Sequence, residues 1–187
     1  MNPVPRSLLP DTSEVAADGM LVIGGCRVDE LSAAHGTPLF VYDEEHLRRR
    51  CREAVAAFPG GAYYATKAFL CGAMARLAHE EGLLLDVATG GELFAAISAG
   101  VPAGRCVLHG NNKSSDELRL AIISGVNHII VDSFDELDRL DALRGEGLAI
   151  PRVALRITPG VEAHTHEYIA TGQDDSKFGF NLANGDA

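Results

Sequence analysis

Cysteine is scarce in this 187-residue sequence, and its four copies are widely spaced, at Cys26, Cys51, Cys71 and Cys106. They form no Cys-x-x-Cys pair, so the sequence indicates neither a zinc site nor a disulfide framework. Scattered single cysteines of this kind are typical of small core residues in a reducing compartment. We therefore expect a cytoplasmic protein with no metal.

Long apolar runs are also absent, and none approaches the ~20 residues that cross a bilayer as a helix. The N-terminal apolar patch is too short for a signal peptide. The 26 acidic residues outnumber the 16 lysines and arginines, giving a net charge of −10, which disfavours nucleic acid and anionic membranes as partners. With 47% hydrophobic and 22% charged residues, we expect a soluble globular protein with a real core.

Two phosphate-binding motifs are missing as well. No Gly-x-Gly-x-x-Gly turn follows the first expected strand, as a doubly wound nucleotide fold would usually require. The polar loop HGNNKS at residues 109–114 lacks the spacing of a P-loop. His164, His166 and Glu167 lie close together but have no further ligands at zinc spacing, so we favour loop hydrogen bonding over a metal site.

From Ala62 onward the sequence becomes periodic. Five short apolar runs end on a polar residue at intervals of 19, 23, 23 and 24 residues. The expected strands are residues 62–66, 83–85, 105–108, 128–131 and 152–155, and the polar residues are Lys67, Asp86, His109, Asp132 and Arg156. Such runs predict strands that are buried on both faces of a parallel sheet.

The segments between these strands have the length and the end signals of helices. Three of them begin with a Ser/Thr-x-x-Glu capping box, at Thr89, Ser114 and Ser133. Four end at a glycine that can take the left-handed conformation, namely Gly82, Gly100, Gly125 and Gly145. Boxes and glycines in phase with five strands predict a repeated βα unit.

Two parallel architectures fit this repeat, a doubly wound sheet and a (β/α)8 TIM-type barrel. We favour the barrel, because its chemistry lies at the carboxyl ends of successive strands, where the five polar residues occur. A barrel needs eight strands and about 250 residues. This α/β sequence supplies five, with a sixth expected after Phe178, so we predict a partial, incomplete barrel over residues 43–187 that belongs to a longer chain.

Residues 1–42 are expected to form a separate N-terminal segment. It contains a predicted strand pair over residues 20–28, a short helix over residues 29–35 and a strand over residues 38–42. Asp43 is predicted to cap a long helix that continues to Phe58, because apolar residues recur there at helical spacing.

Among the polar strand ends, Lys67 either turns out to solvent or is held in the interior for its amine. The second reading suits a Schiff-base lysine, which requires a partly neutral amine such as burial at an apolar strand end can provide. Asp86 and Asp132 could tune such an amine or could cap the helices that follow them. Arg156 requires an oxygen partner, either a cofactor phenolate or a neighbouring carboxylate. His109 could face the barrel mouth or could bind loop carbonyls.

Four stretches carry a resemblance to a known family: YYATKAF at residues 63–69, LDVATGGEL at 85–93, HGNNKS at 109–114 and GVEAHTHEYIATGQDDSKFG at 160–179. Together they resemble the diaminopimelate decarboxylases, in the alanine-racemase-like barrel class of pyridoxal-phosphate enzymes. The first two are shared with ornithine and arginine decarboxylases. The last two point to diaminopimelate decarboxylase.

The resemblance implies that Lys67 binds pyridoxal 5'-phosphate covalently and is the catalytic lysine. It implies cofactor-binding roles for Asp86, Glu92, His109 and Arg156, and a mobile loop over the substrate around His164. The implied reaction is decarboxylation of meso-2,6-diaminopimelate to L-lysine by a homodimer. The N-terminal segment would join a C-terminal β-domain that is missing from this sequence, so the chain alone is expected to be inactive.

The sequence leaves two alternative functions open. The first is another decarboxylase of the same barrel class, acting on ornithine, arginine or carboxynorspermidine. The second is a cofactor-binding module without catalysis, although the glycine-rich phosphate loop implied by the resemblance is not found in this sequence.

Overall fold

The computed structural model describes residues 4–160 and 178–187. The chain divides into two compact units, Met1–Gly60 and Gly61–Ala187. The domain boundary expected from the sequence, between residues 42 and 43, stays a prediction. In the described ranges no helix is both long enough and apolar enough to cross a membrane.

The first unit contains a small antiparallel sheet and two α-helices. Its elements are η1 (Arg6–Leu8), β1 (Glu14–Val15), β2 (Leu21–Ile23), β3 (Cys26–Arg27), α1 (Val28–His35) and α2 (Glu44–Ala57). The three strands pair in the order β1-β2-β3. The strand pair and the short helix expected from the sequence are both confirmed.

The strand expected over residues 38–42 is wrong, because these residues form no regular secondary structure. An apolar run becomes a strand only where another strand satisfies its amides and carbonyls, and the described sheets provide no such neighbour. Phe40 remains 87% exposed. Composition alone therefore misassigned this stretch.

The long helix α2 begins where the sequence predicts it to begin. The Asp43 carboxylate accepts a hydrogen bond from the His46 amide at 3.0 Å, and the Thr12 hydroxyl donates to the same carboxylate. A side-chain oxygen at this position satisfies one of the free amides of the first turn. Asp43 therefore both begins α2 and joins it to the N-terminal residues of its unit.

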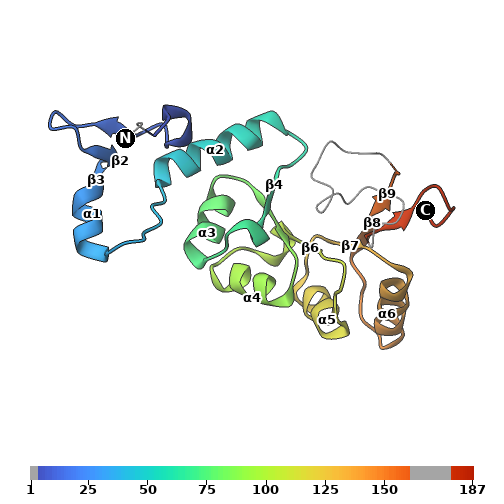
Figure 1. The fold of residues 1–187 in the computed structure, drawn as a ribbon. Helices are drawn as coiled ribbons and strands as arrows, with labels where there is room; N and C mark the ends of the chain where they lie inside the picture. The colour runs from blue at the N-terminus through green and yellow to red at the C-terminus, as the bar shows by residue number, and fades with distance from the viewer. Residues whose placement is uncertain (1–3, 161–177) are drawn as a thin grey trace. The chain divides into compact units, whose positions relative to one another are not determined.

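The second unit alternates strands and helices around a parallel sheet (Figure 1). Its elements are β4 (Tyr63–Ala65), η2 (Thr66–Ala68), α3 (Gly72–Glu80), β5 (Leu84–Val87), α4 (Gly90–Ser98), η3 (Ala103–Arg105), β6 (Cys106–His109), α5 (Ser115–Ser124), β7 (His128–Val131), α6 (Phe134–Gly145), β8 (Arg152–Leu155), β9 (Ile157–Thr158) and β10 (Phe180–Asn181). The strand order is β4-β5-β6-β7-β8, and every pair is parallel. This is the predicted partial barrel.

The register of the sheet places the polar residues at one edge. Asp86 pairs with Val107, and His109 lies two residues beyond Val107. Residues two apart on a strand point to the same face, so Asp86 and His109 share a face. His109 in turn pairs with Ile130 of β7.

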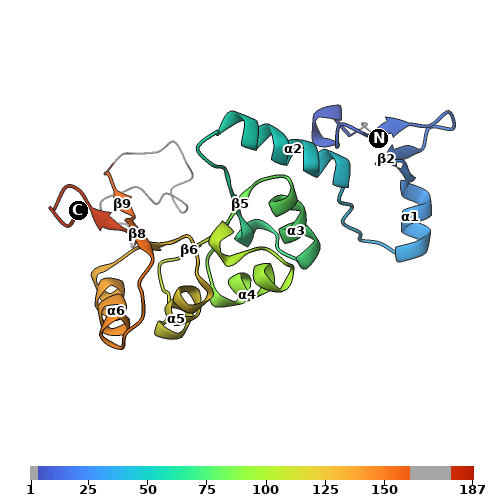
Figure 2. The same ribbon diagram turned by 180° about the vertical axis from the view of Figure 1, so that it is seen from behind.

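The burial of the sheet differs from strand to strand. In β5 and β7 it alternates, with Leu85, Val87, Ile129 and Val131 buried and their neighbours partly exposed. Helices α3 to α6 follow one another along one side of the sheet (Figures 1 and 2). Burial on both faces, as the sequence predicts, holds for the first three residues of β6 and is wrong for β5 and β7, while all of β8 is exposed.

The three predicted capping boxes differ in the structure. Only α5 has both halves: the Ser114 hydroxyl accepts from the Glu117 amide, and the Glu117 carboxylate accepts from the Ser114 amide. In α4 and α6 the hydroxyl half is present. The carboxylates of Glu92 and Glu136 instead accept from the amides of Ala88 and Asp132, one residue before the cap. Each of these carboxylates also binds a side chain of the preceding βα unit, Thr66 for Glu92 and Lys113 for Glu136.

Three of the four predicted C-terminal glycines have positive φ, at Gly82, Gly100 and Gly125. The fourth prediction is wrong. Gly145 is the last residue of α6, and Gly147 takes the left-handed conformation with φ of +91°. Gly145 is thus still helical, and the cap residue Glu146 separates it from the turn.

The strand expected after Phe178 is confirmed as β10. It pairs in parallel with β9, which follows β8 after the single residue Arg156. The Phe180 ring packs edge-on against Phe134 at 5.0 Å between ring centres. This pairing brings Phe178 and Gly179 next to the carboxyl end of β8.

Glu117 gives a pH-dependent prediction for this fold. Hydrogen bonds from the amides of Ser114 and Gly90 hold the pKa of the Glu117 carboxyl below its usual value. A depressed folded-state pKa adds stability above the unfolded pKa of about 4.3, and this stability is lost as the pH falls through the folded value. We expect Glu117→Gln to cost about 1 kcal/mol at pH 7, the size of a helix cap, and less at pH ~4, where the unfolded carboxyl is already largely protonated.

Thermal unfolding of the complete protein at pH 7, 5 and 4 measures this difference. The matched control is Glu146→Gln, which removes an exposed partner of Arg119 and should cost less than about 1 kcal/mol at pH 7. A Glu117→Gln penalty that stays constant between pH 7 and pH 4 would contradict the assignment.

Candidate active site

A cavity of about 300 Å3 opens at the carboxyl edge of the sheet. It is lined by Ala65, Lys67, Asp86, Ala88, His109, Gly110, Asn111, Arg156 and Phe178. These residues come from the ends of β4, β5, β6 and β8 and from the start of the segment that leads into β10. The structure thus brings Lys67, Asp86, His109 and Arg156, four of the predicted site residues, into one pocket.

Asp86 and His109 interact directly in this pocket. Asp86 Oδ2 lies 3.2 Å from His109 Nδ1, and both side chains are partly buried. An ionised carboxylate can only accept a hydrogen bond, so Nδ1 must carry the proton. The pair therefore fixes the imidazole ring and leaves its Nε2 atom available to the pocket.

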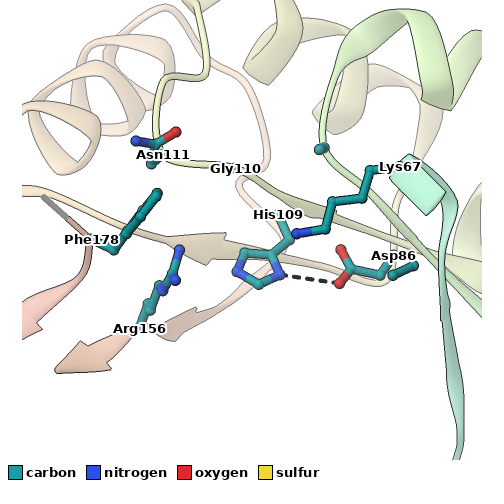
Figure 3. A pocket seen from close by; sticks show the side chains of 9 residues that line it. Lys67, Asp86, His109, Gly110, Asn111, Arg156 and Phe178 are labelled. Atoms are coloured by element: carbon teal, nitrogen blue, oxygen red, sulfur yellow. Dashed lines mark hydrogen bonds and ion pairs between the residues drawn. The ribbon is translucent and has the colours of Figure 1, made fainter. Parts of the chain in front are cut away.

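Lys67 lies just past the end of β4, in the short helical turn η2. Figure 3 shows its side chain reaching toward Asp86 and His109. Of the two positions that the sequence leaves open for Lys67, exposed to solvent or held in the interior, the structure shows the exposed one. Its place among charged and polar neighbours, rather than burial, is what distinguishes this amine.

Glu92 lies behind the pocket wall instead of lining it. Its Oε2 atom accepts from the Thr66 hydroxyl and from the Ala88 amide, each at 2.7 Å. Thr66 directly precedes Lys67, and Ala88 lines the cavity. In the structure, Glu92 therefore fixes the two backbone segments that carry the pocket on this side.

Arg156 forms the opposite side of the pocket (Figure 3). Its Nη1 atom donates to Asp132 Oδ1 at 3.0 Å, and its guanidinium carbon lies 4.4 Å from the centre of the Phe178 ring. Asp132 is only 2% exposed at its side chain. The sequence left the partner of Arg156 open between a cofactor and a carboxylate, and the structure supplies the carboxylate.

Neither aspartate caps the helix that follows it. Thr89 and Ser133 occupy the capping positions of α4 and α6. Asp132 also accepts from the Gly179 amide at 3.2 Å, so it joins β7, Arg156 and the segment leading into β10. The helix-cap alternative for Asp86 and Asp132 is therefore wrong.

Sequence reasoning missed several residues that shape the pocket. For Phe178 the sequence predicts only that a strand follows it, whereas its ring faces the arginine. For Lys113 the sequence predicts no role beyond membership of a polar loop, yet its side chain is fully buried. A lysine two residues past Asn111, inside a polar loop, gave the only sequence signal, and the sequence cannot show that such a lysine turns inward.

The residues of the pocket fit pyridoxal phosphate at its aldehyde and ring end. A primary amine is present for the aldehyde, and a guanidinium and an imidazole are present for the ring oxygen and the charges around it. Small-molecule sites usually have volumes of about 300–1,000 Å3, and this cavity reaches that range. In the part of the chain that the structure describes, no group of three His, Cys, Asp or Glu side chains could hold a metal ion.

A barrel with a lysine at the carboxyl end of one strand and charged groups at the ends of the next strands defines an enzyme-type site. Comparison with protein families agrees, because residues 44–187 match the family model "Pyridoxal-dependent decarboxylase, pyridoxal binding domain". The chain belongs to this family. Its cofactor is therefore pyridoxal phosphate.

Individual relatives show which decarboxylases the chain resembles. The chain is 53% identical over 171 residues to the diaminopimelate decarboxylase of Mycobacterium tuberculosis, covering 90% of this chain and 38% of the relative. Its fold matches diaminopimelate decarboxylase from M. jannaschii in co-complex with L-lysine, with a TM-score of 0.82 and 34% identity, over 96% of this chain and 43% of the other. A lysine/ornithine decarboxylase from Vibrio vulnificus, complexed with putrescine, is less similar, with a TM-score of 0.59 and 28% identity over 71% and 35% of the two chains.

The chain spans about two fifths of the length of the curated relatives that it matches. The loop around His164, His166 and Glu167, which the resemblance places over the substrate, lies outside the described residues. The site described above is thus the part of the pocket that β4 to β10 provide.

Gly179 gives a prediction for the Arg156 side of the pocket. It has φ of +73°, and a Cβ atom there would lie 2.6 Å from the Arg156 carbonyl oxygen. We expect Gly179→Ala to destabilise the complete protein by about 2–3 kcal/mol, through backbone strain and displacement of β10. Pyridoxal phosphate binding should weaken as well, because Phe178 moves with it.

The matched control is Gly185→Ala. Gly185 has φ of +86°, but nothing lies within 4 Å of its Cβ position, so only the conformational cost of about 1–2 kcal/mol is expected. Thermal unfolding and cofactor titration of both variants make the comparison. Equal effects at the two glycines would contradict the close packing of Gly179 against Arg156.

Proposed function

We propose that the protein to which this chain belongs decarboxylates meso-2,6-diaminopimelate to L-lysine with pyridoxal phosphate as cofactor. The observation that carries the proposal is the position of Lys67, in one pocket with the Asp86–His109 pair and Arg156. The similarity to diaminopimelate decarboxylases over nine tenths of the chain supports the choice of substrate.

In this proposal Lys67 attaches the cofactor through its side-chain amine. When bound, pyridoxal phosphate takes up the electron pair that is released as carbon dioxide leaves the substrate. The chain's own task is to hold the reacting groups in place and to supply charge where it is needed. The pocket lining offers two cations, Lys67 and Arg156, against the single carboxylate of Asp86, which suits an anionic ligand.

His109 and Asp86 act as a unit in the proposed site. The Asp86 carboxylate holds the proton on Nδ1, so the neutral ring presents Nε2 as a hydrogen-bond acceptor. The pair can therefore orient a donor on the cofactor or substrate and can accept a proton at a defined atom.

Arg156 supplies a fixed positive charge on the other side. Asp132 and Phe178 hold the guanidinium from two directions, so it loses little further freedom when a ligand binds. Its remaining N–H groups can donate to a phenolic oxygen or a carboxylate. We propose that Arg156 binds a negatively charged group of the ligand.

The resemblance also supports a cytoplasmic homodimer as the working form of the complete enzyme, with a small amino acid as its substrate. The rival substrates are ornithine, arginine and carboxynorspermidine, and a comparison of kcat/KM distinguishes them from meso-diaminopimelate.

Lys67 should carry the cofactor in the complete enzyme. Borohydride reduction of the pyridoxal-phosphate-loaded enzyme, followed by peptide mapping, should place the pyridoxyl group on Lys67. Lys67→Ala should abolish the label and reduce kcat by several orders of magnitude, since the covalent attachment is lost. The internal control is Lys113, which is buried and has three oxygen partners. A label on Lys113 or Lys177 would remove the assignment.

The complete enzyme should prefer meso-diaminopimelate to ornithine and arginine. We expect kcat/KM to be at least about a hundredfold higher, since a site built to bind a polar group rejects analogues that leave it unpaired. Steady-state release of carbon dioxide from each amino acid, and from carboxynorspermidine, measures the preference. A higher kcat/KM for one of the other amino acids would move the protein to a sister activity.

A further inference from the structure

A buried ion pair lies behind the pocket, and neither of its members lines the pocket. Lys113, in the loop after β6, and Glu136, in the first turn of α6, have side chains that are 0% and 4% exposed, with Nζ 2.9 Å from Oε1. Removing two charges from water costs several kcal/mol for each ion, and a pair of this kind often contributes no net stability. The position of the Lys113–Glu136 pair therefore points to a role other than stabilising the fold.

The ammonium group of Lys113 contacts three oxygen atoms. It donates to the Gly110 carbonyl oxygen and, at 2.7 Å, to the Ile130 carbonyl oxygen. Its contact with Glu136 Oε1 is an ion pair without hydrogen-bond geometry. Lys113 thus joins the loop that carries Gly110, a lining residue of the pocket, to the end of β7 and to α6.

Glu136 continues the connection on the other side. Its second oxygen, Oε2, accepts from the Asp132 amide at 3.1 Å. The Asp132 carboxylate in turn holds Arg156 at 3.0 Å and the Gly179 amide at 3.2 Å. A continuous series of polar contacts therefore runs from Gly110 to Arg156, which lie on two different sides of the pocket.

We infer that Lys113 and Glu136 are positioning residues: their buried ion pair sets the spacing between the His109–Asn111 side and the Arg156 side of the cofactor pocket. This inference rests on the proposed function, because it assigns the pair to the same pocket. The network contains two ion pairs, Lys113 with Glu136 and Arg156 with Asp132, and each has no net charge. Removing Lys113 and Glu136 together therefore leaves no unpaired charge behind.

The test separates positioning from stability. In the complete enzyme, Lys113→Met with Glu136→Leu replaces the pair by apolar side chains of similar size, a change that is often neutral or stabilising for folding. Because the Gly110 and Ile130 carbonyl oxygens and the Asp132 amide each lose a partner, which destabilises the fold, we expect a lower unfolding temperature and make the measurements on the folded enzyme below it. We also expect the Kd for pyridoxal phosphate to rise about tenfold or more and kcat to fall by a similar factor, since small misplacements at a site can cost up to about a hundredfold.

The matched control is an ion pair that joins α5 to the end of α6, away from the pocket. Arg119 of α5 and Glu146, which caps α6, form an exposed ion pair at 2.6 Å. The double variant Arg119→Met with Glu146→Leu should leave the Kd, the absorbance spectrum of the bound cofactor and kcat unchanged. A larger effect in this control than in the buried pair would overturn the inference.

A second variant decides the matter if the buried double variant does not fold. Glu136→Gln keeps the size of the side chain, and its single oxygen cannot serve both Lys113 and the Asp132 amide. An increased Kd for pyridoxal phosphate with an altered cofactor spectrum supports positioning, whereas a wild-type Kd and spectrum in the folded variant refutes it. Failure of the wild-type enzyme to bind pyridoxal phosphate at Lys67 would instead refute the proposed function.

Discussion

Glutamate at the third position of three successive helices is the constraint on which the barrel part of the structure depends. Each of these carboxylates accepts a hydrogen bond from a backbone amide at the start of its own helix and also binds a group of the preceding βα unit, by a hydrogen bond for Glu92 and Glu117 and by an ion pair for Glu136. Glu92 reaches the Thr66 hydroxyl, Glu117 the Gly90 amide and Glu136 the Lys113 ammonium. Since each carboxylate binds two groups, the helix starts and the preceding loops are fixed together, and the loops at the carboxyl edge are fixed with them.

This constraint explains how a pocket can be built from loops without long secondary-structure elements around it. The turn that carries Lys67 is held by Glu92, and the loop that carries Gly110 is held through Lys113. Hydrogen bonds to charged groups are stronger than neutral ones, and they gain further where water is excluded. The parts of the pocket that bind ligand are therefore supported from behind by buried polar contacts.

Much of the fold could be predicted from the sequence, because it depends on local signals. The bounds of β7 and β8 follow from short apolar runs, and α2 and α5 begin at the predicted caps. The errors occur where a distant partner decides the outcome: Phe40 has no neighbouring strand, and Lys67 is exposed at a strand end that looked buried. Four candidate site residues could be placed in the pocket from their strand-end spacing, whereas Lys113 could not, since its inward direction depends on Glu136.

The strand β7 shows why contact with the pocket is a poor guide to influence on it. The strands on either side of it supply His109 and Arg156, while β7 itself contributes no lining residue among those described. Its carboxyl end nevertheless provides the Ile130 carbonyl oxygen to Lys113 and the Asp132 carboxylate to Arg156. In a parallel sheet with aligned strand ends, a middle strand can therefore set the distance between its two neighbours through backbone and buried side-chain contacts alone.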